Sequence, residues 1–119
     1  MSLTKEFADK FVHHWINSWN NKDLDGCSNW LDEHVETTSN YIANLFPDSY
    51  GHIRGKESLL KYFSIVLEKM PNFKLKEPVH NIVGNTIMLT TLNAANNKTA
   101  LIGYSFTDEG KIIEIKASL

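Results

Sequence analysis

Two side chains in the C-terminal half of this 119-residue sequence have the chemistry for proton transfer and for hydrogen bonding to a ligand. His80 carries an imidazole whose unperturbed pKa, about 6.5, suits general acid–base catalysis near neutral pH. Tyr104 offers a hydroxyl donor to a ligand carbonyl, as in oxyanion-type sites. Each has a plainer alternative: a bulge at Pro78 would expose His80, and Tyr104 would pack in the core with its hydroxyl at the rim.

Other chemistries find little support. His13 and His14 are neighbours on a predicted helix and point about 100° apart, so they do not chelate one metal together. Cys27 stands alone, which excludes an intramolecular disulfide and is typical of a small buried residue in a reducing compartment. The sequence has no Gly-rich phosphate loop, nucleophile elbow or pair of catalytic carboxylates. We therefore predict neither a metal nor another cofactor.

The composition and charge of the sequence argue against some classes of binding partner. The formal net charge is -2, and Lys and Arg form no cluster that would neutralise nucleic acid or an acidic membrane surface. No apolar run approaches the roughly 18 residues that span a bilayer. The length and the 42% hydrophobic content are those of one globular domain, residues 1–119, for which we expect a cytoplasmic location.

An antiparallel meander from Phe73 to Ala117 must position both candidate residues. Its strands are rich in Val, Ile, Thr, Tyr and Phe, as sequential strands are. Three turn signals separate them, and each is treated as a two-residue loop. The turns are Gly84-Asn85, Asn96-Asn97 and Glu109-Gly110, and the strands are 73–83, 86–95, 98–108 and 111–117.

Alternation along these strands assigns their side chains to two faces. The predicted inner face carries His80, Ile82, Ile87, Leu89, Thr91, Ala100, Ile102, Tyr104, Phe106, Ile113, Ile115 and Ala117. The outer face keeps Met88, Leu92, Leu101 and Ile112 among small polar residues. This face predicts a homodimer that buries it.

The preceding segments predict helices with one apolar stripe each. Thr4 caps a helix to about Asn20, and Asp23 caps a short helix that carries residues up to Leu31. Strand 33–39 and an irregular, aromatic-rich stretch 41–53 follow. A third helix begins after Gly55 and is stopped by Pro71. Helices first and strands last indicate an α+β fold in which helices cover one face of a curved antiparallel sheet. A cone of this kind encloses a pocket.

The segments Trp15-Ile16-Asn17-Ser18-Trp19-Asn20-Asn21-Lys22-Asp23-Leu24-Asp25-Gly26 and Gly55-Lys56-Glu57-Ser58-Leu59-Leu60-Lys61-Tyr62-Phe63, followed by four strands, resemble the nuclear transport factor 2-like superfamily. Within it the likeness is to SnoaL-like proteins and ketosteroid isomerases. The resemblance implies a cone-shaped, cystatin-like roll with N-terminal helices. It also implies frequent dimers, and it spans isomerases, cyclases, dehydratases and non-catalytic binders.

The resemblance to ketosteroid isomerases departs at the catalytic positions. The family's general-base Asp matches Thr37 or Thr38, and its oxyanion-hole Asp matches Ile102. The family's Tyr on the first helix matches Trp15, which keeps one donor in its indole N–H. Proton shuttling by that mechanism is therefore not expected.

Two functions remain as predictions. The first is a cofactor-free isomerase or cyclase type of enzyme that acts on a steroid- or polyketide-like substrate, with His80 and Tyr104 in acid–base roles. The second is a non-catalytic module that binds a small hydrophobic ligand or dimerises. Aromatic residues among the predicted contacts have core packing as their alternative role. The predicted ligand contacts are Trp15, Trp19, Thr37, Tyr41, His52, Phe63, Thr91, Ile102 and Ile115.

Overall fold

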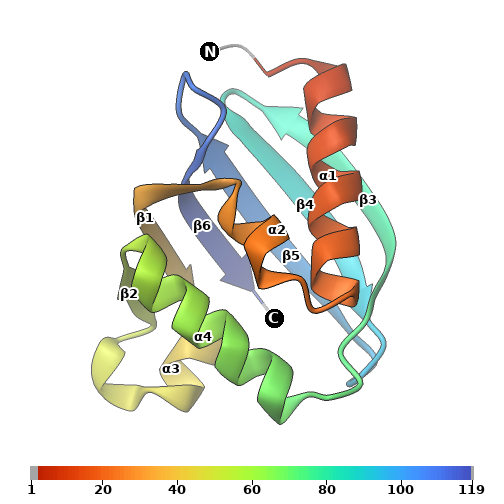
Figure 1. Ribbon diagram of the computed structural model, residues 1–119. Helices are drawn as coiled ribbons and strands as arrows, with labels where there is room; N and C mark the ends of the chain where they lie inside the picture. Colours follow the sequence, from red (N-terminus) through yellow and green to blue (C-terminus); the bar gives the residue numbers. More distant parts are fainter. Residues whose placement is uncertain (1–2, 119) are drawn as a thin grey trace.

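The computed structural model describes residues 3–118 as one curved sheet with helices on its inner face (Figure 1). The helices are α1 (Lys5–Asn20), α2 (Leu24–Ser28), α3 (Asn40–Leu45), a 3-10 helix (Pro47–Ser49) and α4 (Lys56–Lys69). The strands are β1 (Leu31–Ser39), β2 (His52–Arg54), β3 (Leu75–Val83), β4 (Thr86–Asn93), β5 (Lys98–Phe106) and β6 (Ile112–Ser118).

The six strands lie in the order β2-β1-β6-β5-β4-β3 and do not close into a barrel. Strands β1 and β6 run parallel, and every other neighbouring pair is antiparallel. The predicted meander forms β3 to β6, and the β1–β2 hairpin extends the sheet beyond β6. The predicted α+β class, with a curved sheet and N-terminal helices, is confirmed.

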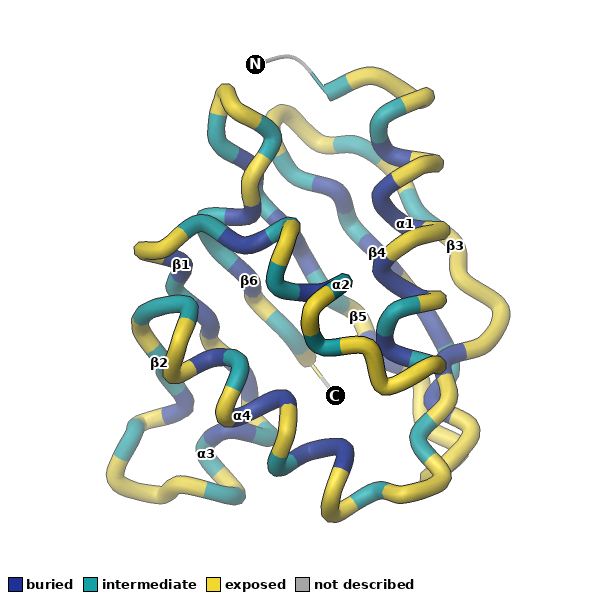
Figure 2. The backbone as a smooth tube through the Cα atoms, in the orientation of Figure 1, coloured by how far each residue is buried: buried dark blue, intermediate teal, exposed yellow. Residues whose placement is uncertain are grey.

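Local side-chain bonds define where the first two helices begin. The Thr4 hydroxyl accepts a hydrogen bond from the Phe7 N–H at 3.0 Å, and the Asp23 carboxylate accepts one from Gly26 at 3.0 Å. At the other end of α1, the side-chain amide of Asn20 joins the helix to β3: it accepts a hydrogen bond from the Leu75 N–H and donates one to the Leu75 carbonyl. The sides of α1 and α4 that face the sheet are buried (Figure 2).

The first two hairpins test the predicted register. Val83 pairs with Thr86 around the two-residue loop that was predicted. The second prediction is wrong, because Asn93 pairs with Lys98 and the turn has four residues, 94–97. The side chains of Asn93 and Asn96 accept hydrogen bonds from the N–H groups of Ala95 and Lys98, which stabilises the longer turn. The turn is two residues longer than predicted, and because two is an even number, the side chains of β4 and β5 stay on the predicted faces of the sheet. The inner face holds Ile87, Leu89, Thr91, Ala100, Ile102 and Tyr104.

The third hairpin contains a bulge that reverses one assignment. Phe106 pairs with Ile112, one residue earlier than a two-residue loop would give. The extra residue is Ile113 on β6, because Ser105 pairs with Glu114 while Phe106 pairs with Ile112. Beyond the bulge, the N–H and the hydroxyl of Thr107 both bond Lys111 across the turn. Ile112 is consequently fully buried and Ile113 is partly exposed, so the predicted faces of these two residues were wrong.

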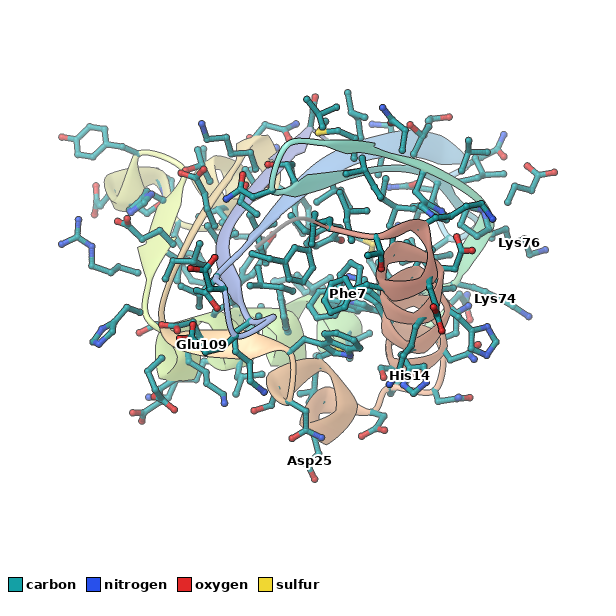
Figure 3. All side chains as sticks on the ribbon, turned by 90° about the horizontal axis from the view of Figure 1, so that it is seen from above. Phe7, His14, Asp25, Lys74, Lys76 and Glu109 are labelled. Atoms are coloured by element: carbon teal, nitrogen blue, oxygen red, sulfur yellow. The ribbon has the colours of Figure 1, made fainter. Side chains whose placement is uncertain are left out.

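The core fills the space between the helices and the sheet. Phe11 of α1 packs edge-on against the rings of Trp30, Tyr104 and Phe106, at centroid distances of 5.0 to 5.2 Å. Phe7 points from α1 into this interior, whereas Lys74 and Lys76 project outward near β3 (Figure 3).

The second helix is shorter than predicted. It ends at Ser28, and Leu31, which was predicted to belong to it, begins β1.

The outer face of the sheet exposes several large apolar side chains. Val79, Val83 and Leu101 are 69%, 58% and 47% exposed. The thioether of Met88 lies over Gly103 on this face, within 3.1 Å of where a Cβ would stand. The homodimer through this face stays a prediction.

Candidate ligand-binding cavity

A cavity of about 280 Å³ lies between the inner face of the sheet and the helices α1, α3 and α4. Its apolar walls come from both layers, and the ring of Trp19 packs against Phe63 at 4.7 Å and against Phe73 at 5.1 Å. The apolar lining includes Trp15, Trp19, Phe63, Val66, Phe73, Ile102 and Ile115. A space of this composition suits a compact, largely apolar molecule.

The closed end of the cavity is formed by three paired residues on the neighbouring strands β1, β6 and β5. Thr37 of β1 and Tyr104 of β5 both lie opposite Ile115 of β6. Neighbouring strands are about 4.8 Å apart, so the backbones of Thr37 and Tyr104 are separated by roughly 10 Å. Two hydroxyl groups therefore flank one apolar side chain at this end.

A buried hydrogen bond orients the Tyr104 hydroxyl. The indole N–H of Trp15 donates to Tyr104 Oη at 2.8 Å, and the two residues are 1% and 2% exposed. Because the hydroxyl accepts in this bond, its own proton is left for another acceptor. Burial raises the pKa of Tyr104 well above its usual value, although the Trp15 bond opposes that shift. The group is therefore a donor at neutral pH, and it does not act as a base.

Thr37 is the unusual polar group of the cavity. The residue is 3% exposed, and its hydroxyl has no hydrogen-bond partner among residues 3–118. Its neighbour in the lining, Ser39, accepts a hydrogen bond from the Tyr41 N–H at 3.0 Å. Burial raises the pKa of Tyr62 to about 12. Thr37 thus presents a desolvated hydroxyl that a ligand oxygen or nitrogen could satisfy.

Polar side chains gather at the open end. Asn96 lies in the β4–β5 turn, Asn44 comes from α3, and the exposed Lys98 begins β5. The buried Asn93 ends β4 beside them. The lining contains no Asp, Glu or His side chain. The cavity thus changes from neutral hydroxyls at its closed end to amides and one cation at its mouth.

The structure brings together most of the residues that were predicted to contact a ligand. Seven of them line the cavity, as does Tyr104, which was predicted to be catalytic. The seven are Trp15, Trp19, Thr37, Tyr41, Phe63, Ile102 and Ile115. The N–H of Trp15, which the resemblance presented as a donor for a ligand, is instead committed to Tyr104.

Three predicted residues lie outside the cavity lining. His80 is on the inner face but pairs through Nε2 with Asp9 of α1 at 2.9 Å, two strands away from Ile102. The Thr91 hydroxyl donates to the Lys76 carbonyl at 2.8 Å, beside the β3 bulge. His52 lies on β2 and bonds Thr38. His80 and Tyr104 are therefore not brought into one site, and their catalytic roles stay predictions.

Several lining residues had not been predicted as contacts. Ser39, Asn40, Asn44 and Tyr62 belong to elements whose course across the sheet depends on long-range packing. Alternation places Lys98 on the same side of β5 as Ala100 and Ile102, yet a lysine at the end of a strand does not indicate that it borders a cavity. Pairing of β1 with β6 is what brings Thr37 and Ser39 into the same space.

The remaining titratable groups offer no second centre within residues 3–118. No three His, Cys, Asp or Glu side chains of this part are grouped to hold a metal ion. Burial, followed by the nearby Asp23 charge, raises the pKa of Cys27 to about 12, so its thiol stays protonated. No helix in the same residues has the length and apolar character to cross a membrane.

Comparisons with known proteins agree on the fold. A SnoaL-like protein of unknown function from Burkholderia thailandensis superposes with a TM-score of 0.92 at 23% identity, covering 98% of this chain and 97% of its own. A proposed ketosteroid isomerase from Kribbella flavida gives a TM-score of 0.72 at 12% identity, covering 95% and 77%. A proposed polyketide cyclase from Xanthomonas campestris gives 0.71 at 15% identity, covering 97% and 91%.

Sequence comparison adds no further assignment. No family model matches the chain, and no curated protein is similar to it in sequence. The chain therefore has the fold of SnoaL-like and nuclear transport factor 2-like proteins, as the sequence resemblance predicted. At these identities the likeness establishes the fold, and function has to be argued from the cavity.

Proposed function

We propose that the protein binds a small, largely apolar molecule that carries a hydrogen-bonding oxygen, in the cavity between the sheet and the helices α1 and α4. The observation that carries this proposal is the buried hydroxyl of Thr37, a residue that is 3% exposed; this hydroxyl lacks a hydrogen-bond partner among residues 3–118. A buried hydroxyl without a hydrogen bond costs roughly 1–3 kcal/mol. A ligand oxygen at this point would recover part of that cost.

The walls support an apolar, ring-bearing body for the ligand. Indole and phenyl rings of Trp15, Trp19 and Phe63 face the cavity and pack edge-on against one another. The volume of about 280 Å³ is at the lower end of the range for small-molecule pockets. A molecule with one or two rings, or a flexible chain of similar volume, fits these dimensions.

Binding is better supported than acid–base turnover. The lining offers no carboxylate or imidazole to accept a proton near neutral pH. Tyr104 is held in its protonated form by burial, so it can donate a hydrogen bond to a ligand oxygen. His80, the imidazole predicted for catalysis, is engaged with Asp9 outside the lining.

The test compares 2-naphthol with naphthalene by titration calorimetry in the wild type and in Thr37→Val. Valine removes the unpartnered hydroxyl, so the free energy of unfolding should rise by about 1 kcal/mol while the preference for 2-naphthol over naphthalene falls. Ser105→Val serves as the control, because its hydroxyl bonds Thr86 on the outer face. No measurable binding of either compound to the wild type would refute the proposal.

A further inference from the structure

We infer that the ligand of this cavity is an amphipathic carboxylic acid with a neutral oxygen at its far end, held with its carboxylate at Lys98 and its oxygen at the closed end, where Thr37 and Tyr104 lie. The inference rests on the proposed binding function and names the chemical class of the ligand. Its basis is the way in which polar groups are distributed between the two ends of the cavity.

Strand β5 forms a floor that connects the two ends. Its alternate residues Lys98, Ala100, Ile102 and Tyr104 all line the cavity. Tyr104 lies six positions after Lys98, which corresponds to about 20 Å of strand. Tyr104 is 2% exposed and Lys98 is exposed, so the floor runs from the closed end to the solvent. The apolar side chains between them match the body of an elongated ligand.

Lys98 provides an uncompensated positive charge at the mouth. The lining holds no acidic side chain, and within residues 3–118 no carboxylate lies in ion-pair distance of the Lys98 ammonium. Asn96 adds a donor, because its side-chain oxygen accepts from the Lys98 N–H at 3.1 Å and its NH₂ group remains. A cation with amide donors beside it is suited to a carboxylate.

The closed end of the cavity favours a neutral oxygen of the ligand over a carboxylate. Thr37 and Tyr104 are neutral and almost fully buried, and no cation lies among the residues that surround them in the lining. A carboxylate placed there would be desolvated without a counter-charge, which is strongly unfavourable. A hydroxyl or carbonyl oxygen can instead bond Thr37, or accept from Tyr104 on the other side of Ile115. The orientation of the ligand follows from this difference.

Three ten-carbon probes separate the two ends: 10-hydroxydecanoate carries both groups, decanoate lacks the far oxygen, and decane-1,10-diol lacks the carboxylate. Calorimetric titration of the wild type should give the tightest binding for 10-hydroxydecanoate. Lys98→Met should weaken binding of both carboxylates about fivefold and leave the diol unchanged. Thr37→Val should weaken the two hydroxyl-bearing probes and leave decanoate unchanged. Lys10→Met, which removes an exposed charge from α1, is the matched control and should alter none of them.

The outcomes distinguish the inference from the function on which it rests. If the wild type binds 2-naphthol but shows no preference for the carboxylates, or if Lys98→Met and Lys10→Met behave alike, the inference is overturned and the cavity-binding function stands. If neither 2-naphthol nor any ten-carbon probe binds, both are overturned. A carboxylate preference that is lost in Lys98→Met and kept in Lys10→Met supports the inference.

Discussion

Replacing Tyr104 with phenylalanine is expected to lower the free energy of unfolding by about 1–3 kcal/mol, although the ring is retained. The reason is that the indole N–H of Trp15, 1% exposed, would lose its acceptor and stay buried without a partner. Urea denaturation followed by circular dichroism measures the change. An unaltered midpoint would contradict the role assigned to this hydrogen bond.

A double-mutant cycle separates the bond from ring packing. Trp15→Phe removes the donor and also reduces the volume of the side chain, so it should destabilise more than Tyr104→Phe does. When both residues are phenylalanine, neither polar group is left unpaired. The double variant should therefore cost less than the sum of the single variants, by about 1 kcal/mol. Strict additivity would show that the two groups are not coupled.

Ala100→Phe is expected to weaken binding of 2-naphthol by more than about tenfold while the protein stays folded. Ala100 is 4% exposed on the floor of the cavity, opposite Thr91, and a benzyl group there would take up the space of the ligand. Filling an existing cavity costs less than inserting atoms into a packed core. Calorimetric titration reports the loss of binding, and thermal unfolding verifies the fold.

The adjacent residue provides the control for this substitution. Leu101 precedes Ile102 on the same strand but faces outward and is 47% exposed, so Leu101→Phe adds a ring on the opposite face of the sheet. Its affinity for 2-naphthol should equal that of the wild type. Equal losses of affinity in both variants, or none in Ala100→Phe, would show that the ligand does not use the cavity.

Much of the fold could be predicted because its signals are local. Thr4 and Asp23 cap helices through hydrogen bonds to residues three positions later, and Gly84-Asn85 forms the predicted two-residue loop. Alternation then assigned the inner faces of β4 and β5 correctly. The wrong length of the second turn did not alter these faces, because the turn is longer than predicted by two residues, an even number. Ile112 was misplaced because a bulge shifts the count by one residue.

The site was predictable only in part, because its polar contacts join residues far apart in the sequence. Trp15 and Tyr104 are 89 residues apart, and alternation gives no indication that they share a hydrogen bond. Thr91 and Thr37 are both inner-face threonines. The Thr91 hydroxyl bonds the Lys76 carbonyl beside the β3 bulge, whereas the Thr37 hydroxyl has no hydrogen-bond partner among residues 3–118. The difference between a satisfied and an unsatisfied group required three-dimensional packing.

Binding in the cavity is tested most directly by following the indole N–H signals of the three tryptophans in a 15N-labelled wild-type sample during titration with 2-naphthol. Trp15 and Trp19 line the cavity, whereas Trp30 packs against Phe7 and Phe11 outside the lining. Ligand binding in the cavity should produce saturable shifts of the Trp15 and Trp19 signals and leave the Trp30 signal stationary. Three unchanged signals, or a shift confined to Trp30, would contradict ligand binding in this cavity.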